Sequence, residues 1–239
     1  MTRYIFFTLS LFVSLSLQGQ NTQIDSILQQ FEGVPINEIV EYEISKSDSL
    51  SYSVGVVIAQ NLVNQGFTQV NHLIVSKAIS DVMDGSDLII PWEEADANFK
   101  GEIIRLNSIK KQMIKQAGEE FLAANKTREG VVTTASGLQY EVLVEGDGPS
   151  PSATDKVKVH YHGTLIDGQV FDSSVDRGEP ISFQLNQVIQ AWQEGVPLMK
   201  VGSKHKIFCP YTLAYGERAA GPIQPFSTLI FEIELLGIE

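Results

Sequence analysis

The sequence contains very little cysteine and fewer basic than acidic side chains. Cys209 is the single cysteine among 239 residues, so an intrachain disulfide is excluded and packing must hold the chain together. In HKIFCPY this cysteine alternates with apolar neighbours, which is typical of a buried strand residue and not of a nucleophile. Only 17 lysine and arginine residues stand against 29 acidic ones, for a net charge of -12. Because phosphate binding needs clustered basic residues, a nucleic-acid-binding protein is not expected.

Several catalytic and binding motifs are also missing. There is no G-x-S-x-G nucleophile elbow and no glycine-rich phosphate loop, which argues against serine hydrolases and P-loop enzymes. His160 and His162 share one face of an expected strand, but no third ligand has a spacing that supports a metal site. We therefore expect neither a metal nor another cofactor.

A long apolar run occurs at the beginning of the chain. Arg3 precedes apolar residues 4–17, and the small residue Gly19 follows, which is the arrangement of a secretory signal peptide. The alternative is a membrane anchor, but the run is shorter than the roughly 20 residues that a spanning helix needs. The sequence therefore predicts export, cleavage near Gly19 or Gln20, and a processed protein without a membrane span.

Residues 23–125 have the apolar spacing of helices. The clearest stretch is 92–125, where apolar residues recur at about the 3.6-residue period of an α-helix and acidic residues occupy the first turn. One long helix is expected there, with Gly101 and Gly118 as weak points at which it could bend. Shorter helices are predicted at 50–64 and 69–83.

The pattern changes to that of a β-sheet after a boundary at 127–136. Period-two alternation predicts strands, and sequences such as GDGPSPS and IDGQ predict turns between them. The expected strands are 137–144, 156–165, 181–185, 204–210 and 228–236. A helical segment at 186–197 interrupts them, so this half is expected to be a small antiparallel sheet covered by one short helix.

Three segments of this second half follow one another in the order of a known family. VHYHGTLIDGQVFDSSVDRG, NQVIQAWQEGVPLMKVGSK, and LAYGERAAG followed by STLIFEIELLGI resemble the FKBP-type peptidyl-prolyl cis-trans isomerases. The resemblance covers residues 137–239. It implies an enzyme that accelerates rotation about X-Pro bonds, built as an antiparallel half-barrel wrapped on one short helix.

The first half resembles one subgroup of that family. DSLSYSVGVVIAQNLVNQGF and EEFLAANKTREGVVTTASGLQY are similar to the helical part of Mip-like and FkpA-like secreted isomerases. The implied fold class is α+β, with an all-α dimerisation domain joined by a long helix to the half-barrel. The implied divisions are a signal peptide at 1–19, a dimerisation domain at 20–91, a linking helix at 92–126 and an isomerase domain at 127–239.

Prolyl isomerisation explains why these motifs contain no nucleophile. The peptide bond resists rotation by about 18–20 kcal/mol because of its partial double-bond character. The two isomers of an X-Pro bond differ by only about 0.5–1 kcal/mol, yet they exchange slowly. An apolar, preformed pocket with a few polar groups can favour the twisted amide over both planar forms, without making or breaking a covalent bond.

The resemblance assigns roles to residues of one pocket. The catalytic residues would be Tyr161, Phe171, Asp172 and Tyr215. Tyr215 would donate a hydrogen bond to a substrate carbonyl, and Asp172 would lie at the rim beside the twisting carbonyl. The substrate-binding residues would be Arg177, Ile181, Val188, Ile189, Trp192, Ile223 and Phe231. Trp192 would form the floor, whereas Ile181, where many members have an aromatic residue, is expected to thin one wall and weaken binding of macrolide immunosuppressants, a further candidate ligand.

The same residues have ordinary structural interpretations when each is taken alone. Val188, Ile189 and Trp192 would serve equally well as the core face of one short helix. Asp172 and Arg177 would form a surface ion pair that contributes about 0–1 kcal/mol. Only their joint occurrence, in family order, favours the pocket.

Partners and location also follow from the resemblance. The expected substrates are unfolded or nascent polypeptides that contain proline, and the amino-terminal helices are expected to form a homodimer with folding-chaperone activity. The expected compartment is the periplasm of a Gram-negative bacterium, with outer-membrane association or secretion as alternatives. A dimer that only holds clients without catalysis, and a surface role in virulence, both remain open.

Overall fold

The computed structural model describes residues 46–239. The expected signal peptide and the beginning of the expected dimerisation domain, up to residue 45, lie outside the described residues. The chain forms two compact units that divide between Val56 and Val57, and each is described by itself. Among residues 46–239, no helix combines the length and the apolar character that crossing a membrane would require.

Two helices precede the longest one. They are α2, Lys46–Asn64, and α3, His72–Asp84. The side chain of Asn71 accepts hydrogen bonds from backbone N–H groups of the first turn of α3, and Gly85 ends this helix in the left-handed conformation, with a φ of 68°. Both helices are predicted by the apolar spacing, and their observed beginnings differ from the expected ones by about one turn.

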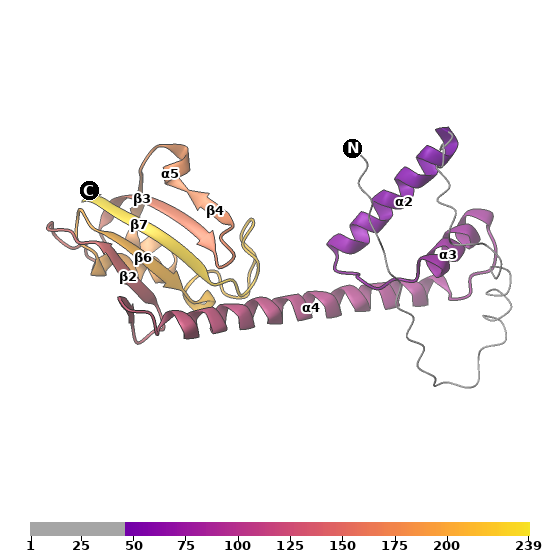
Figure 1. Cartoon of the computed structure of the whole chain (residues 1–239), viewed down its shortest axis with the longest axis horizontal. Coiled ribbons are helices and arrows are strands. Elements are labelled where there is room, and N and C mark those ends of the chain that lie inside the picture. Colours follow the sequence, from indigo (N-terminus) through magenta and orange to yellow (C-terminus); the bar gives the residue numbers. More distant parts are fainter. Residues whose placement is uncertain (1–45) are drawn as a thin grey trace, which may run out of the picture. The chain divides into compact units, whose positions relative to one another are not determined.

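The longest element is α4, Trp92–Asn125, which confirms the predicted long helix residue for residue (Figure 1). Both suspected weak points lie inside it, and the helix continues through each of them. Gly101 is exposed, and a Cβ atom added there would meet nothing within 4 Å. Gly118 is buried, and a Cβ atom there would collide with Thr228. The two glycines therefore have different structural roles although they lie in the same helix.

The strands form one antiparallel sheet in the order β1-β2-β6-β7-β3-β4, and β5 also pairs with β3. Their bounds are β1 Val131–Thr133, β2 Gln139–Val144, β3 Lys156–Leu165, β4 Val170–Ser173, β5 Ile181–Gln184, β6 Lys204–Cys209 and β7 Leu229–Ile238. The five predicted strands are confirmed. The sequence interpretation misses β1 and β4, which have three and four residues, because so few positions do not establish a period of two.

The core lies between one face of this sheet and α6, Gln190–Gly195. Alternate residues of β3 point inward, so Val157 and Val159 are fully buried, as are Ile233 and Leu235 on β7. Cys209 on β6 is also fully buried, which confirms the predicted buried strand thiol, and this burial raises its pKa.

The predicted helix at 186–197 is helical only in part. Short 3₁₀ turns, Leu185–Gln187 and Val196–Leu198, flank α6. Val188 and Ile189 have extended backbones, with ψ angles of 178° and 152°. The interpretation of both residues as part of a helix is therefore wrong, because these β-branched residues lead the chain into α6 in the extended conformation that their side chains favour.

Candidate active site

A pocket of about 690 Å³ opens on the core face of the sheet. Strands β3, β4, β5 and β7, the turn before α6, α6 itself and the loop between β6 and β7 all contribute to it. The lining residues are Tyr161, Phe171, Asp172, Phe183, Gln187, Val188, Ile189, Trp192, Tyr215, Ala220, Pro222, Ile223 and Phe231. This volume and this mostly apolar lining suit a small ring with a few polar attachments.

Aromatic rings packed edge to face form the inner part of the pocket. Trp192 is 4% exposed, and its ring lies 5.4 Å from those of Tyr161 and Phe231, at angles of 84° and 83°. Phe183 approaches Trp192 at 5.5 Å, and Phe171 approaches Phe231 at 5.4 Å. Because each ring is held by its neighbours at favourable angles, the cavity is preformed.

A glycine makes room for one of these rings. Gly163 on β3 lies opposite Asp172 on β4 and opposite Phe231 on β7. A Cβ atom at Gly163 would lie 2.7 Å from two ring carbons of Phe171 and 3.1 Å from Phe231. Phe171 can therefore turn its ring toward the pocket only because position 163 has no side chain.

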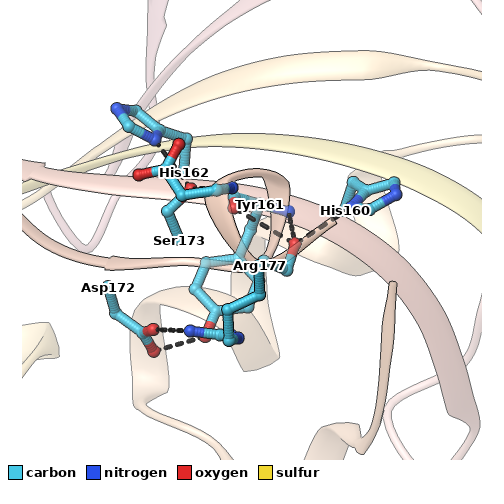
Figure 2. Close-up of polar contacts among 8 residues, drawn as sticks. His160, Tyr161, His162, Asp172, Ser173 and Arg177 are labelled. Atoms are coloured by element: carbon cyan, nitrogen blue, oxygen red, sulfur yellow. Dashed lines mark hydrogen bonds and ion pairs between the residues drawn. The ribbon is translucent and has the colours of Figure 1, made fainter. Parts of the chain in front are cut away.

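Three polar side chains meet at the rim. The Tyr161 hydroxyl donates a hydrogen bond to one carboxylate oxygen of Asp172, and Arg177 donates one to the other oxygen (Figure 2). The second Nη atom of Arg177 donates to the Tyr161 hydroxyl at 3.1 Å. Asp172 is the penultimate residue of β4, and the helical turn α5, Ser174–Arg177, brings Arg177 back beside it. Both carboxylate oxygens therefore have fixed donors.

The titration of these groups follows from their contacts. Burial by itself would raise the pKa of Asp172, but the hydrogen bonds from Tyr161 and Arg177 outweigh it and leave that pKa lowered. The pKa of Tyr161 is raised, first by burial and then by its bond to Asp172. Asp172 is therefore an anion at neutral pH, paired with the Arg177 cation, and Tyr161 is a neutral hydrogen-bond donor.

Comparison with known proteins agrees with this geometry. The family described as "FKBP-type peptidyl-prolyl cis-trans isomerase" matches residues 148–236, and "Domain amino terminal to FKBP-type peptidyl-prolyl isomerase" matches residues 47–142. The FKBP-type peptidyl-prolyl cis-trans isomerase FkpA of Aeromonas hydrophila is 44% identical over 214 residues, which cover 86% of this chain and 80% of that protein. This chain belongs to the FKBP-type peptidyl-prolyl cis-trans isomerases.

Other members are similar over most of their length. The outer membrane protein MIP of Legionella longbeachae is 41% identical over 200 residues, covering 80% of this chain and 85% of that protein. The crystal structure of FkpA from Escherichia coli superposes with a TM-score of 0.69 at 32% identity, covering 83% of this chain and 98% of that one. The protein is therefore an FKBP-type isomerase with a helical amino-terminal part and a carboxy-terminal antiparallel sheet, as the sequence predicts.

Most of the residues that the resemblance predicts for one pocket line this aromatic pocket. All of them line it except Arg177, which reaches the rim through Asp172, and Ile181. Ile181, on β5, lies opposite Val159 of β3 and is half-buried against the core. Phe183, two residues further along the same face of β5, supplies the aromatic side of this wall. The period of two in ISFQ was the signal that could have pointed to Phe183.

The sequence interpretation also omits Gln187, Ala220 and Pro222, which line the pocket from a turn and from a loop. No periodic pattern marks such positions, because loop residues are placed by tertiary contacts.

The two strand histidines lie outside the aromatic pocket. Tyr161 points into the core, so its neighbours His160 and His162 point to the opposite face of β3. Their Nδ1 atoms lie 3.1 Å and 2.9 Å from the hydroxyls of Ser174 and Ser173, respectively (Figure 2). Within residues 46–239, no three histidine, cysteine or acidic side chains are grouped as metal ligands.

Proposed function

We propose that this isomerase binds the proline ring of an X-Pro segment in the aromatic pocket, above Trp192. The observation that carries the proposal is the cage of edge-to-face rings around that indole, with polar groups confined to the rim. The ring of proline is apolar and rigid, so a preformed apolar cavity can bind it at low entropic cost. The proposed binding residues beside Trp192 are Val188, Ile189, Ile223 and Phe231, with Arg177 at the rim and Ile181 supporting one wall from behind.

The proposed catalysis lowers the cost of the twisted amide. A planar amide is stabilised by charge separation between its nitrogen and its oxygen, and this separation decreases as the bond twists. An apolar wall formed by Tyr161 and Phe171 disfavours the charge-separated planar form more than the twisted one, which lowers the barrier. Asp172 adds a fixed negative charge beside the carbonyl. Tyr215, 42% exposed, presents its hydroxyl to a neighbouring substrate carbonyl.

A peptide assay tests these roles. The cis-to-trans relaxation of a short X-Pro peptide is followed in a protease-free assay with wild type, Phe171→Ala, Asp172→Ala and His162→Ala. Because His162 lies on the opposite face of β3, its variant is the matched control and retains activity. We expect kcat/KM to fall at least about tenfold for Phe171→Ala, which corresponds to about 1.4 kcal/mol of lost transition-state stabilisation. Unchanged rates in both pocket variants would show that the site is elsewhere.

The proposed biological role is assistance to exported proteins. The basic residue and apolar run of residues 1–19 support a signal peptide, and the proposed substrates are unfolded or nascent chains with exposed proline in the periplasm of a Gram-negative bacterium. Outer-membrane association or secretion is the alternative, and a relative carries the name outer membrane protein MIP. Cell fractionation with amino-terminal sequencing of the processed chain tests this. A chain that begins at Met1 would contradict it.

We also propose that a second copy of the chain binds the amino-terminal helices. Apolar side chains are exposed on α2 and α3, including Leu50, Tyr52, Val57, Val63, Leu73, Ile74, Val82 and Met83. So many apolar side chains on neighbouring turns are typical of an interface. The proposed divisions are a dimerisation domain at 20–91, a linking helix at 92–126 and an isomerase domain at 127–239. Equilibrium sedimentation of wild type and Ile74→Asp tests the dimer, which the aspartate is expected to dissociate.

Chaperone activity is the second proposed function, and the exposed apolar side chains of α2 and α3 favour it. If clients bind the helical part, Phe171→Ala still suppresses aggregation of an unfolded client although its isomerase rate falls. If suppression and isomerase activity fall together, client binding depends on the pocket instead.

A further inference from the structure

One wall of the pocket is a long loop, residues 210–228, between β6 and β7. It contributes Tyr215, Ala220, Pro222 and Ile223 to the lining. Backbone hydrogen bonds hold it together: Ala220 and Ile223 each donate to the other's carbonyl at 2.9 Å and 3.0 Å, and the N–H of Phe226 donates to the carbonyl of Gly216 at 2.9 Å. The positions of Tyr215 and Ile223 therefore depend on how the base of this loop is held.

The base of the loop contains a residue in an unfavourable conformation. Phe226 has a φ of 65°, and among residues 46–239 it is the only residue other than glycine with a positive φ. A bulky side chain keeps this conformation only where its surroundings hold it. Its ring lies 5.2 Å from that of Tyr211, at an angle of 67°, so the two ends of the loop contact each other through these rings.

Helix α4 contacts both ends of the loop. The Nζ atom of Lys115 lies 5.8 Å from the centre of the Tyr211 ring, which is a cation–π contact. Three residues later, on the same face of the helix, buried Gly118 lies against Thr228, which is 3% exposed. A Cβ atom at Gly118 would lie 2.4 Å from the Thr228 hydroxyl oxygen and 3.2 Å from its Cβ atom. The helix and the loop can therefore meet only because position 118 is glycine.

The next turns of α4 are anchored to the sheet. The ring of Phe121 lies 6.0 Å from that of Phe208 on β6. The side chain of Asn125 donates to Gln139 on β2 at 2.8 Å, and Gln139 in turn donates to the carbonyl of Leu122 at 2.9 Å. These contacts fix the end of α4 on the sheet, so the turn that contains Gly118 is a rigid support for the loop.

We propose that Gly118 is a positioning residue of the isomerase. Close packing of α4 on Thr228 and Tyr211 holds loop 210–228 so that Tyr215 and Ile223 face the substrate. A shift of α4 at this point moves the pocket wall, so the long helix is coupled to substrate turnover. This inference rests on the proposed role of the pocket.

The test compares one substitution at two positions of the same helix. Gly118→Ala adds a methyl group that collides with Thr228, whereas Gly101→Ala adds the same group where nothing lies within 4 Å. A misplacement of about 1 Å near a reacting group can cost about 100-fold in rate, so we expect kcat/KM of Gly118→Ala to fall about tenfold or more. Gly101→Ala is expected to keep the wild-type rate with a higher thermal midpoint. Both are assayed in the full chain, at a temperature where circular dichroism shows them folded.

Rescue separates positioning from general loss of stability. In Gly118→Ala/Thr228→Ala the hydroxyl oxygen that the new methyl group meets is absent, so kcat/KM is expected to recover, whereas Gly118→Ala/Thr228→Ser keeps that oxygen and stays slow. A Gly118→Ala enzyme within twofold of wild type, or a slow one that Thr228→Ala does not rescue, overturns the proposal. A wild-type protein that does not accelerate isomerisation would instead contradict the proposed function.

If Gly118→Ala does not fold, hydrogen exchange of Thr228→Ala decides the question. This single variant loosens the contact without adding atoms. The amides of Ala220, Ile223 and Phe226 are then expected to exchange faster than in wild type, while those of β3 are unchanged. Equal protection of the loop amides in both proteins overturns the proposal.

Discussion

Replacing Tyr161 by phenylalanine is expected to lower the free energy of unfolding, because Asp172 loses a hydrogen-bond donor. The change removes one oxygen atom, which donates to Asp172 and accepts from Arg177 at 3.1 Å, and leaves the ring in place against Trp192. A net hydrogen bond contributes about 0.5–1.5 kcal/mol, or up to about 3 kcal/mol with a charged partner. Because the Asp172 side chain is 45% exposed, solvent screening reduces this gain. We expect a loss of about 1 kcal/mol in the free energy of unfolding at neutral pH.

The pH dependence of this loss identifies its cause. Asp172 has a lowered pKa in the folded protein, so its ionised form contributes stability above its unfolded pKa of about 3.9, and this contribution is lost as the pH falls through the folded pKa. The Tyr161 hydroxyl helps to lower that pKa, so the difference in stability between wild type and Tyr161→Phe is expected to shrink in acid. Urea unfolding at pH 7 and at decreasing pH below 4 measures it.

A double-mutant cycle completes the test. In an Asp172→Asn background the carboxylate is absent at every pH, so Tyr161→Phe is expected to cost little there and its cost is expected to be independent of pH. The reasoning is refuted if Tyr161→Phe loses the same free energy at neutral and acid pH, or the same free energy with Asp172 and with asparagine at position 172.

Two further predictions concern buried polar groups. His205 is 4% exposed, its Nδ1 atom has no partner among the described residues, and burial lowers its pKa. The thermal midpoint is therefore expected to fall as the pH drops below about 6.5, and His205→Phe is expected to reduce this dependence of the midpoint on pH. An equal pH dependence in both proteins contradicts the prediction. Asn125→Leu leaves the Gln139 oxygen without its buried donor and is expected to lower the free energy of unfolding, measured in urea, by about 1–3 kcal/mol. Asn125→Leu/Gln139→Leu is expected to recover most of this loss. A double variant as unstable as the single one contradicts the prediction.

Local patterns were sufficient for most elements of the fold. The helix at 92–125 and the strand at 156–165 are found residue for residue, because each is long enough for its period of burial to repeat several times. The strand at 170–173 and the break at Val188 and Ile189 are too short to produce such a period. Contacts with neighbouring strands and the core set the conformation of these short segments.

The order of motifs also predicted most of the pocket, since Tyr161, Asp172 and Trp192 belong to segments similar to those of one family. It did not predict that Phe183 lines the wall near Ile181, because both residues share one face of β5 and the sequence does not say which of them the pocket reaches.

The sequence by itself determined the helices, the longer strands and the family of this isomerase, because these depend on periodicity and on motifs within short stretches of chain. Only the tertiary structure decided what its glycines do. Gly101 and Gly118 are both helix-weakening residues in the sequence, yet one faces open space and the other meets Thr228, more than a hundred positions later. Contacts between such distant residues depend on how whole elements pack, and no local pattern encodes them.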